Sequence, residues 1–234
     1  RKEKVKAMIK REAPDLIGFQ EVHSWVWQWL EETLGDEYMI VGCGRNENYS
    51  GEGTPLAFRK SRFRMLHMDT FWLSDTPDVP GSRLTGCDQS KYPRMAVSVL
   101  LKDMETNELI TFVNTHTDHT GVVARDLELK QVAAYLKGQK GRKIVTGDMN
   151  ALPDASEITN FLKETEPFGM RDATADVGGT FHNFGRAASY SKIDYIFTDL
   201  PVLESHAVED APDAGVYYSD HLAVCSVIQL NDKI

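Results

Sequence analysis

Cysteine is scarce in this chain of 234 residues, and its placement suggests no special use. The three cysteines, Cys43, Cys87 and Cys225, are scattered, and no two of them form a Cys-x-x-Cys pair. An odd number without paired spacing indicates neither a disulfide framework nor a structural zinc site. We expect three free or buried thiols.

Long apolar runs are also missing. No run approaches the ~18 residues that a membrane-spanning helix needs, so we expect no membrane span. The first six residues, Arg-Lys-Glu-Lys-Val-Lys, contain no apolar core of a signal peptide. We therefore expect a cytoplasmic protein, with the alternative that a trimmed N-terminus carried a signal.

The chain also has no excess of basic residues. Lysine and arginine number 26 against 35 aspartates and glutamates, which gives a net charge of −9. A net negative surface repels phosphate backbones, which argues against a long basic groove for nucleic acid but is compatible with a small local basic site. The same balance suits a protein that gathers carboxylates around a cation.

The chain shows the composition and periodicity of one folded domain. It is 41% hydrophobic and contains no internal repeat, low-complexity tract or linker, so we expect a single domain over residues 1–234. Helical spacing predicts helices over residues 4–12, 25–34 and 122–137, and a short one after Pro153. Alternating or continuous apolar runs predict strands over residues 15–19, 38–41, 56–59, 63–73, 94–100, 109–115, 143–147, 193–198, 202–208 and 222–230. This order favours two mostly antiparallel sheets packed face to face with helices outside.

Polar side chains stand at five places where such apolar runs end. Burying carboxylates, imidazoles and amides is costly unless they find partners, so we expect these groups to be each other's partners. The five fragments are Phe19-Gln20-Glu21, Asn114-Thr115-His116-Thr117-Asp118-His119, Gly147-Asp148-Met149-Asn150, Lys192-Ile193-Asp194-Tyr195 and Ser219-Asp220-His221.

Each fragment has a plain and a functional interpretation. Glu21 is either a surface group or a ligand for a hard divalent cation. Asp148 and Asn150 either close an Asx turn or orient a water molecule. A lone histidine is usually structural. His116 and His221 both have carboxylate neighbours, which favours a role in stabilising the negative charge of a phosphate.

The five fragments, in this order and rough spacing, resemble the endonuclease/exonuclease/phosphatase superfamily, the group of deoxyribonuclease I. Trp72-Leu73-Ser74 and Arg94-Met95-Ala96 look like a bacterial branch related to nocturnin-like enzymes. The resemblance covers residues 15–227. It implies an α/β fold, a four-layer α/β sandwich of two mostly antiparallel sheets flanked by helices.

The resemblance also implies roles on the metal and water side of the site. Glu21 resembles the main metal ligand, with Asp220 as a neighbouring or alternative ligand, and the expected ion is Mg²⁺, with Mn²⁺ as the alternative. Asp148 resembles the residue that activates the attacking water. Asn150 resembles its partner, which contacts the water or the phosphate.

On the phosphate side, His221 resembles the histidine that binds the scissile phosphate, and Asp194 the carboxylate that orients it. His116 resembles the second histidine of the site, which stabilises phosphate charge or assists the leaving group. Arg94 resembles the arginine that contacts phosphate, since its planar fork matches phosphate oxygens.

Together these features predict a divalent-metal-dependent phosphoester hydrolase of the phosphodiesterase or nuclease type. A phosphomonoesterase acting on a small phosphorylated metabolite, such as a sugar phosphate, is the alternative, and a non-catalytic member of the fold has less support. The expected partner is a phosphorylated small molecule or a nucleic-acid end, and we expect a monomer.

Three loops, residues 44–54, 74–93 and 176–190, are expected to select the substrate. Within them the residues of interest are Arg83, Lys91, Phe181, His182, Asn183 and Phe184, with buried aromatics in a polar loop as the plain alternative. One departure from the family pattern stands out. Members usually begin with a strand that carries a metal-binding asparagine, whereas residues 1–12 look helical, so we expect that this strand is absent here and exists in the natural protein.

Overall fold

The computed structural model describes residues 1–210 and 215–230, and its largest element is a six-stranded sheet. The strand order is β4-β5-β6-β7-β9-β8. These strands are β4 (Phe63–Trp72), β5 (Met95–Asp103), β6 (Leu109–His116), β7 (Arg142–Asp148), β8 (Arg171–Asp172) and β9 (Asp194–Thr198). β6 and β7 run parallel, and every other neighbouring pair is antiparallel.

The second sheet layer is divided in two. One part has the order β1-β3-β2 and the other pairs β10 with β11. Their bounds are β1 (Leu16–Gly18), β2 (Tyr38–Val41), β3 (Leu56–Arg59), β10 (Val202–Ala207) and β11 (Val224–Ile228). The sequence pattern predicted a single sheet here. Among the described residues β1 pairs only with β3 and β11 only with β10, and the additional N-terminal strand stays a prediction.

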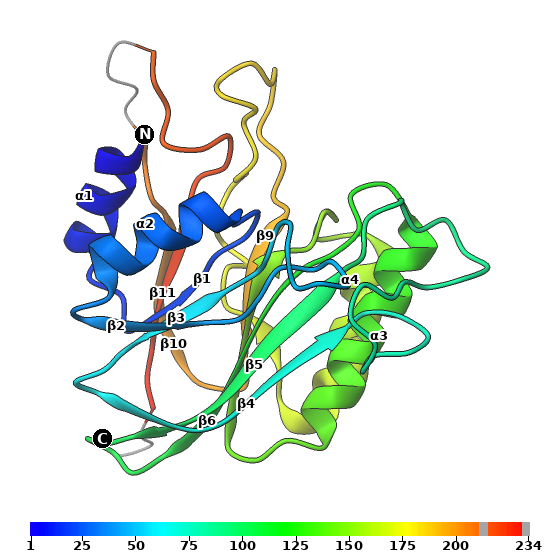
Figure 1. Cartoon of the computed structure of the whole chain (residues 1–234), viewed down its shortest axis with the longest axis horizontal. Helices are drawn as coiled ribbons and strands as arrows, with labels where there is room; N and C mark the ends of the chain where they lie inside the picture. The colour runs from blue at the N-terminus through cyan, green and yellow to red at the C-terminus, as the bar shows by residue number, and fades with distance from the viewer. Residues whose placement is uncertain (211–214, 231–234) are drawn as a thin grey trace.

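Helices cover the outer faces, which gives the four predicted layers (Figure 1). α3 (Val122–Lys137) and α4 (Ser156–Thr165) pack on the six-stranded sheet through Leu129, Phe161 and their neighbours. α1 (Lys2–Glu12) and α2 (Ser24–Leu34) pack on β2 and β3 through Ile9 and Leu30. The α/β sandwich expected from the sequence is therefore confirmed.

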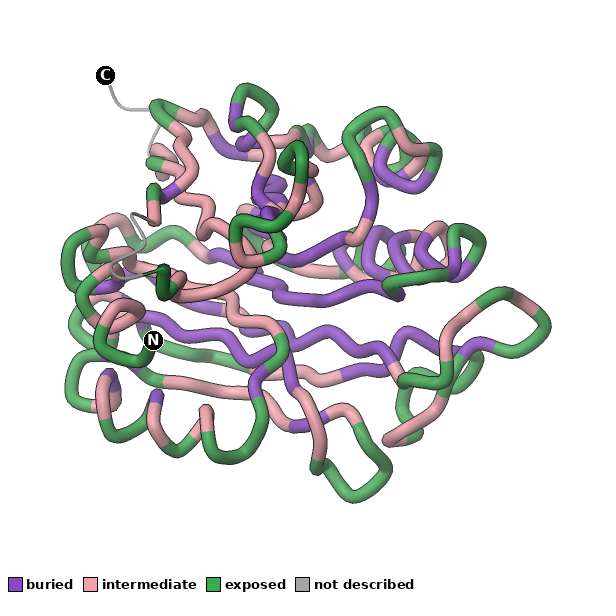
Figure 2. The backbone as a smooth tube through the Cα atoms, turned by 90° about the horizontal axis from the view of Figure 1, so that it is seen from above, coloured by how far each residue is buried: buried purple, intermediate pink, exposed green. Residues whose placement is uncertain are grey.

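The central strands are apolar because both of their faces are covered. Leu56 and Phe58 of β3 meet Val97, Phe112 and other residues of the large sheet between the two layers. Figure 2 shows buried backbone concentrated in the stacked strands through the middle of the molecule. Strands with two covered faces read as continuous apolar runs, which is why β5 and β6 are visible in the sequence.

The N-terminal turn of α2 is partly exposed. His23 occupies the N-cap of this helix, and Trp25 is 62% exposed. Trp27 and Trp29 lie against the core beneath α2. Residues 166–190 contain little regular structure, namely a 3₁₀ turn, Glu166–Phe168, and the two-residue strand β8.

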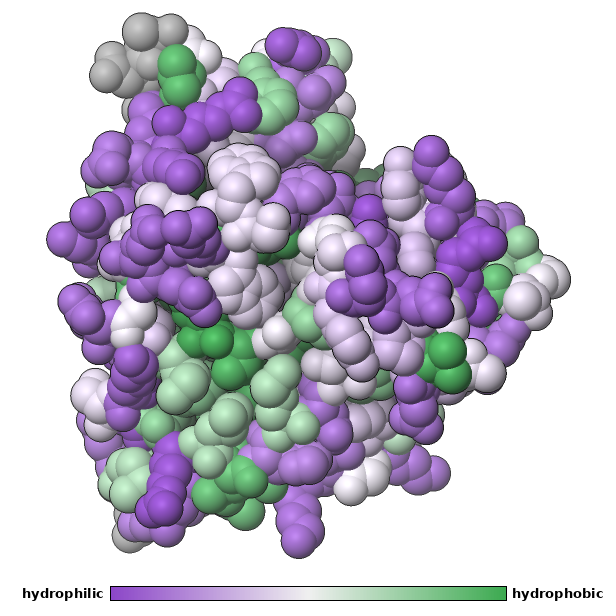
Figure 3. All heavy atoms as spheres, viewed as in Figure 1, coloured by the Kyte–Doolittle hydropathy of each residue, from purple (hydrophilic) through white to green (hydrophobic). Residues whose placement is uncertain are grey.

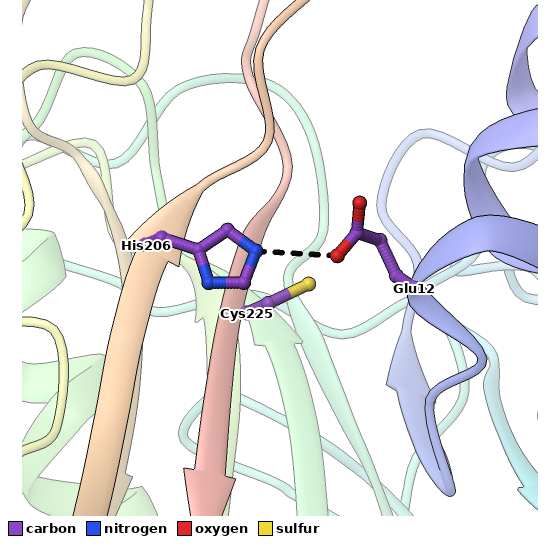
Figure 4. Close-up of side chains that lie close together, drawn as sticks. All are labelled: Glu12, His206 and Cys225. Carbon is purple, nitrogen blue, oxygen red and sulfur yellow. Dashed lines mark hydrogen bonds and ion pairs between the residues drawn. The ribbon is translucent and has the colours of Figure 1, made fainter.

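The end of α1 is tied to the small two-stranded sheet. His206 Nε2 lies 3.2 Å from Glu12 Oε2, and Cys225 stands opposite His206 on β11 (Figure 4). Polar groups cover most of the face in Figure 3, while apolar side chains gather below α2, over the small sheets. In the part of the chain that the structure describes, no helix is long and apolar enough to cross a membrane.

Candidate active site

Three predicted site residues stand in one row across the large sheet. His116 ends β6, Asp148 ends β7 and Asp194 begins β9, and the strand register places Asp148 directly opposite both of the others. Residues opposite one another on neighbouring strands point to the same face, so the three side chains converge. Four polar fragments of the sequence thereby meet at one sheet end, because His221 joins this row.

His221 completes the cluster that we call the acidic side, with Asp148 and Asp194. Its Nδ1 lies 2.8 Å from Asp194 Oδ2, and its Nε2 lies 3.9 Å from Asp148 Oδ2. Burial opposes a charged imidazole, but the hydrogen bond and charge of Asp194 outweigh it and raise the pKa of His221 to about 9. His221 is therefore an imidazolium at neutral pH, held in place by Asp194.

His116 has the opposite charge state. Its Nε2 lies 3.5 Å from Asp148 Oδ2, and the residue is 6% exposed. Burial and the positive charges of Arg94 and Arg45 lower its pKa well below the usual value. Asp148 thus lies between a cationic and a neutral histidine, and burial together with the charge of Asp194 raises the pKa of its carboxyl.

Asn150 adopts the Asx arrangement that was one of its two interpretations. Its backbone N–H donates to Asp148 Oδ1 at 2.9 Å, and its side-chain amide donates to the Thr117 carbonyl at 3.2 Å. Its φ of 48° lies in the left-handed region, which a non-glycine residue rarely occupies. The turn occupies only one carboxylate oxygen of Asp148, so Oδ2 remains directed at the two histidines.

Glu21 follows β1 in a left-handed conformation, with a φ of 57°, and its residue is exposed at the mouth of the site. Burial by surrounding atoms and the negative charges of Glu52 and Asp220 raise the pKa of its carboxyl. Mg²⁺ prefers oxygen ligands such as carboxylates. The neighbouring carboxylates of Glu21, Glu52 and Asp220 therefore fit a divalent cation. The ligand atoms of Asp148, Asp194 and His221 also lie within 4.8 Å of one another and form a second candidate set.

Asn114 positions the segment that carries Glu21. Its side chain is fully buried, and its amide lies 2.7 Å from the Phe19 carbonyl and 3.0 Å from that of Pro55. Its Oδ1 accepts hydrogen bonds from Gln20 and from Thr146 Oγ1. One amide on the large sheet thus fixes both the end of β1 and the start of β3, although the sequence marks it only as part of a motif.

Arg94 belongs to the other side of the site. A small pocket next to His116 is lined by Glu21, Arg45, Glu52, Gly53, Thr54, Pro93, Arg94, Met95 and His116. Arg94 is 3% exposed, its Nη2 lies 2.9 Å from His119 Nδ1, and its Nε lies 3.6 Å from Asp118 Oδ2. We call Arg45, Arg94 and His119 the arginine side.

Arg45 was missed by sequence reasoning. Its Nη2 lies 2.7 Å from Glu52 Oε2, and its guanidinium stands 4.7 Å from the centre of the Tyr92 ring. The Tyr92 ring in turn lies 5.9 Å from that of His119. Position in the chain was the only signal in the sequence for this side of the site. Arg45 and Glu52 lie near the two ends of the loop of residues 44–54, which was expected to select the substrate, and His119 follows His116 in the same fragment.

A buried carboxylate network supports the arginine side. Asp118 accepts hydrogen bonds from Ser90, Thr120 and Gly121, which outweigh its burial and hold its pKa well below the usual range. The Asp118 N–H donates to Glu128 Oε2 at 2.8 Å, and the Gln89 amide donates to Oε1 at 2.9 Å. The loop of residues 74–93 is thereby fastened to α3.

The loop of residues 176–190 borders the acidic side. The Phe181 and His221 rings are 4.9 Å apart, and Phe181 forms a β-bridge with His221. The backbone N–H groups of His182 and Asn183 donate to the Asp220 carbonyl, while the His182 side chain is fully buried. Phe181 therefore lies beside His221 at the acidic side, whereas the His182 side chain is buried, as the plain interpretation of this loop expected.

Arg83 and Lys91 have contacts within their own loop. Arg83 donates to the Ser90 carbonyl at 2.9 Å, and Lys91 Nζ lies 5.1 Å from the centre of the Tyr92 ring.

A separate group of Glu12, His206 and Cys225 also brings metal-ligating atoms together, far from these loops in the sequence (Figure 4). Arg11 already pairs with Glu12, and burial and the charge of Glu12 raise the pKa of the Cys225 thiol to about 11, which keeps it protonated.

A four-layer α/β sandwich with carboxylates and histidines at the ends of its central strands defines a class of metal-dependent phosphoesterases. The sequence model of the endonuclease/exonuclease/phosphatase family matches residues 1–221. The chain belongs to this family, as the resemblance implied, and is a phosphoester hydrolase that depends on a divalent metal. A search of curated protein sequences finds no significant match.

Solved structures agree with this assignment. An endonuclease/exonuclease/phosphatase protein from Bacteroides vulgatus is 33% identical, with a TM-score of 0.89 over 99% of this chain and 90% of that one. A mannosyl-6-phosphatase from Bacteroides thetaiotaomicron is 25% identical, with a TM-score of 0.83 over 98% and 90%. The human Nocturnin catalytic domain, at 20% identity, a TM-score of 0.68 and coverage of 97% and 87%, shares the fold.

Proposed function

We propose that this chain hydrolyses a phosphoester bond by in-line attack of a water molecule that Asp148 positions and deprotonates. The observation that carries the proposal is the position of Asp148, which lies 3.5 Å from a neutral histidine and 3.9 Å from a cationic one. Its raised pKa makes its carboxylate a better proton acceptor near neutral pH than an exposed aspartate.

The two histidines then serve different steps. His221, held cationic by Asp194, faces the negative oxygens of the phosphate and stabilises the charge that develops during attack. His116 is neutral, so it acts as a hydrogen-bonding group beside the leaving oxygen rather than as a resting acid. For Asn150, whose amide donates to the Thr117 carbonyl at 3.2 Å, we propose a further contact with the water or with a phosphate oxygen.

Glu21 and Asp220 would hold the divalent cation, for which we propose Mg²⁺, with Mn²⁺ as the alternative. When bound, the ion neutralises phosphate charge and lowers the pKa of a coordinated water. The same attack serves phosphodiesters, the leading prediction from the sequence, and phosphomonoesters. The likeness to a mannosyl-6-phosphatase supports the second of these, a sugar phosphate or similar small metabolite.

The test uses purified protein, an aryl phosphate, a bis-aryl phosphate and a single-stranded oligonucleotide, each with Mg²⁺, Mn²⁺ or a chelator. We expect hydrolysis that needs the ion and that falls at least 10²-fold in Asp148→Asn and in His221→Asn. Thermal unfolding of both variants serves as the folding control. Turnover that persists in Asp148→Asn would contradict the assignment.

A further inference from the structure

The pocket beside His116 contains buried polar atoms that the protein leaves without hydrogen-bond partners. Among the described residues five buried side-chain atoms have no hydrogen-bond partner, and three of them, Thr54 Oγ1, Arg94 Nε and Arg94 Nη1, belong to residues that line this pocket. Of these three, Arg94 Nε has an ionic contact with Asp118 Oδ2 at 3.6 Å. Thr54 is 6% exposed and Arg94 is 3% exposed. An unsatisfied buried donor costs free energy, and more when it is charged, so a ligand that satisfies these groups recovers that free energy on binding.

The unpaired groups select the chemistry of such a ligand. Two guanidinium N–H groups can only donate, and a hydroxyl can donate as well, so the matching ligand presents several acceptor oxygens. Arg45 adds a second guanidinium on the outer wall, where it is 12% exposed and already oriented by Glu52 and by the Tyr92 ring.

The inner wall of the pocket limits the shape of the ligand. Gly53, Thr54, Arg94 and Met95 are all buried, and Met95 is only 1% exposed. An oxygen that reaches Thr54 and Arg94 meets buried residues on this wall, so a terminal oxygen suits this place better than one that carries a further ester substituent.

We propose that Arg45, Thr54 and Arg94 form a subsite for the terminal oxygens of a phosphomonoester dianion, with Arg45 and Thr54 as the specificity-determining residues. The proposal rests on the proposed function and deepens it, because it names the substrate class as a small-molecule phosphomonoester rather than a phosphodiester. A diester carries one charge and two ester substituents, so it offers too few terminal oxygens for this wall and the metal-facing side together.

Two variants with little structural cost test the proposal. Arg45→Met removes the outer guanidinium, and Thr54→Val removes an unpartnered hydroxyl at nearly constant shape. Arg64→Met, an exposed arginine on β4, is the matched control. Arg45→Lys keeps the charge but loses the fork and should lie between wild type and Arg45→Met.

The first measurement is kcat/KM for an aryl phosphate and for a bis-aryl phosphate. We expect wild type to prefer the monoester by at least about tenfold. We expect Arg45→Met to lower monoester turnover about 10–100-fold and Thr54→Val about tenfold, with changes below about threefold for the diester, because a hydrogen bond to a charged group is lost in each case. A wild-type preference for the diester, or equal losses on both esters, would overturn the proposal.

The second measurement does not depend on turnover. Inorganic phosphate should raise the unfolding temperature of wild type and of the Arg64→Met control, and this protection should be lost in Arg45→Met and Thr54→Val. If neither ester is hydrolysed, the proposed function fails, and phosphate protection alone decides the subsite. Absence of protection in wild type, or protection that survives in both variants, would refute the subsite even if the enzyme is active.

Discussion

Asp194 and His221 already hold each other at 2.8 Å, whereas two buried guanidinium nitrogens of Arg94, Nε and Nη1, have no hydrogen-bond partner among the described residues, although Nε lies 3.6 Å from Asp118 Oδ2. The acidic side is complete before a substrate arrives, and its preorganised charges need no rearrangement during the reaction. The arginine side is incomplete and can release energy only when a ligand binds. Under the proposed function, this difference separates the groups that perform the chemistry from those that recognise the substrate.

Replacing Asp194 by a neutral residue is the strongest test of the difference between the two sides. In Asp194→Asn the side chain can still accept from His221, but it no longer stabilises the imidazolium, so we expect kcat to fall about 10²–10⁴-fold with KM changed much less. Steady-state kinetics with Mg²⁺ measures both values. Asp36→Asn, at an exposed position after α2, is the control. A loss below threefold would mean that His221 does not depend on this carboxylate.

Asn114 connects the segment that carries Glu21 to the large sheet, and its loss should disturb the fold as well as the site. We expect Asn114→Ala to lower the free energy of unfolding by about 3 kcal/mol or more, because several buried carbonyl and side-chain groups lose their partner together. Thr146→Val removes only one of these hydrogen bonds and should cost about 1 kcal/mol. Urea unfolding of the two variants checks this, and equal losses would show that Asn114 is not the shared partner.

The pH dependence of the free energy of unfolding tests the contribution of Glu128, whose carboxyl accepts the Asp118 N–H beneath the arginine side. Burial raises the pKa of its carboxyl in the folded protein to about 7 from the ordinary value of 4.5, despite the hydrogen bonds from Asp118 and Gln89. Its contribution is therefore most favourable below pH 4.5 and is lost as pH rises through about 7, on the order of 3 kcal/mol in total. Urea unfolding at pH 5 and pH 8 should show this loss in wild type but not in Glu128→Gln. The same slope in both proteins would exclude Glu128 as its source.

Lys130, half a turn further along α3, should have the smallest effect. It pairs with Asp126 at 2.7 Å on the solvent side of the helix, and exposed pairs of this spacing contribute about 0.3–0.5 kcal/mol. Lys130→Met should therefore change the free energy of unfolding by less than about 0.5 kcal/mol at both pH values. A larger, pH-dependent change would mean that the pH dependence of stability assigned to Glu128 arises from α3 as a whole.

Much of the sandwich was predictable because its central strands are buried on both faces. The runs around Val97, Phe112 and Val145 are continuous and apolar, so they read as strands without any tertiary information. The division of the second layer was not predictable, since β10 and β11 are only partly buried and their apolar pattern does not say which strand they pair with. Pairing of strands distant in sequence is decided by tertiary packing.

The same distinction holds for the site. His116, Asp148, Asp194 and His221 were found because charged residues that interrupt apolar runs are conspicuous, and the structure brings them together. Arg45 was not found, because it lies in a polar loop where charges are ordinary. Its contacts with Glu52 and with Tyr92 depend on how separate loops come together, and no local spacing records that.

The row formed by His116, Asp148 and Asp194 has a consequence for how such an enzyme can change over time. These three side chains stand opposite one another on β6, β7 and β9, so a single inserted or deleted residue within one of these strands would turn the side chain of that strand away from the other two. Insertions in the loops of residues 44–54 or 74–93 would leave that row untouched. Descendants of such a protein can therefore exchange one phosphorylated substrate for another by remodelling loops, while the hydrolytic step is inherited unchanged with the sheet.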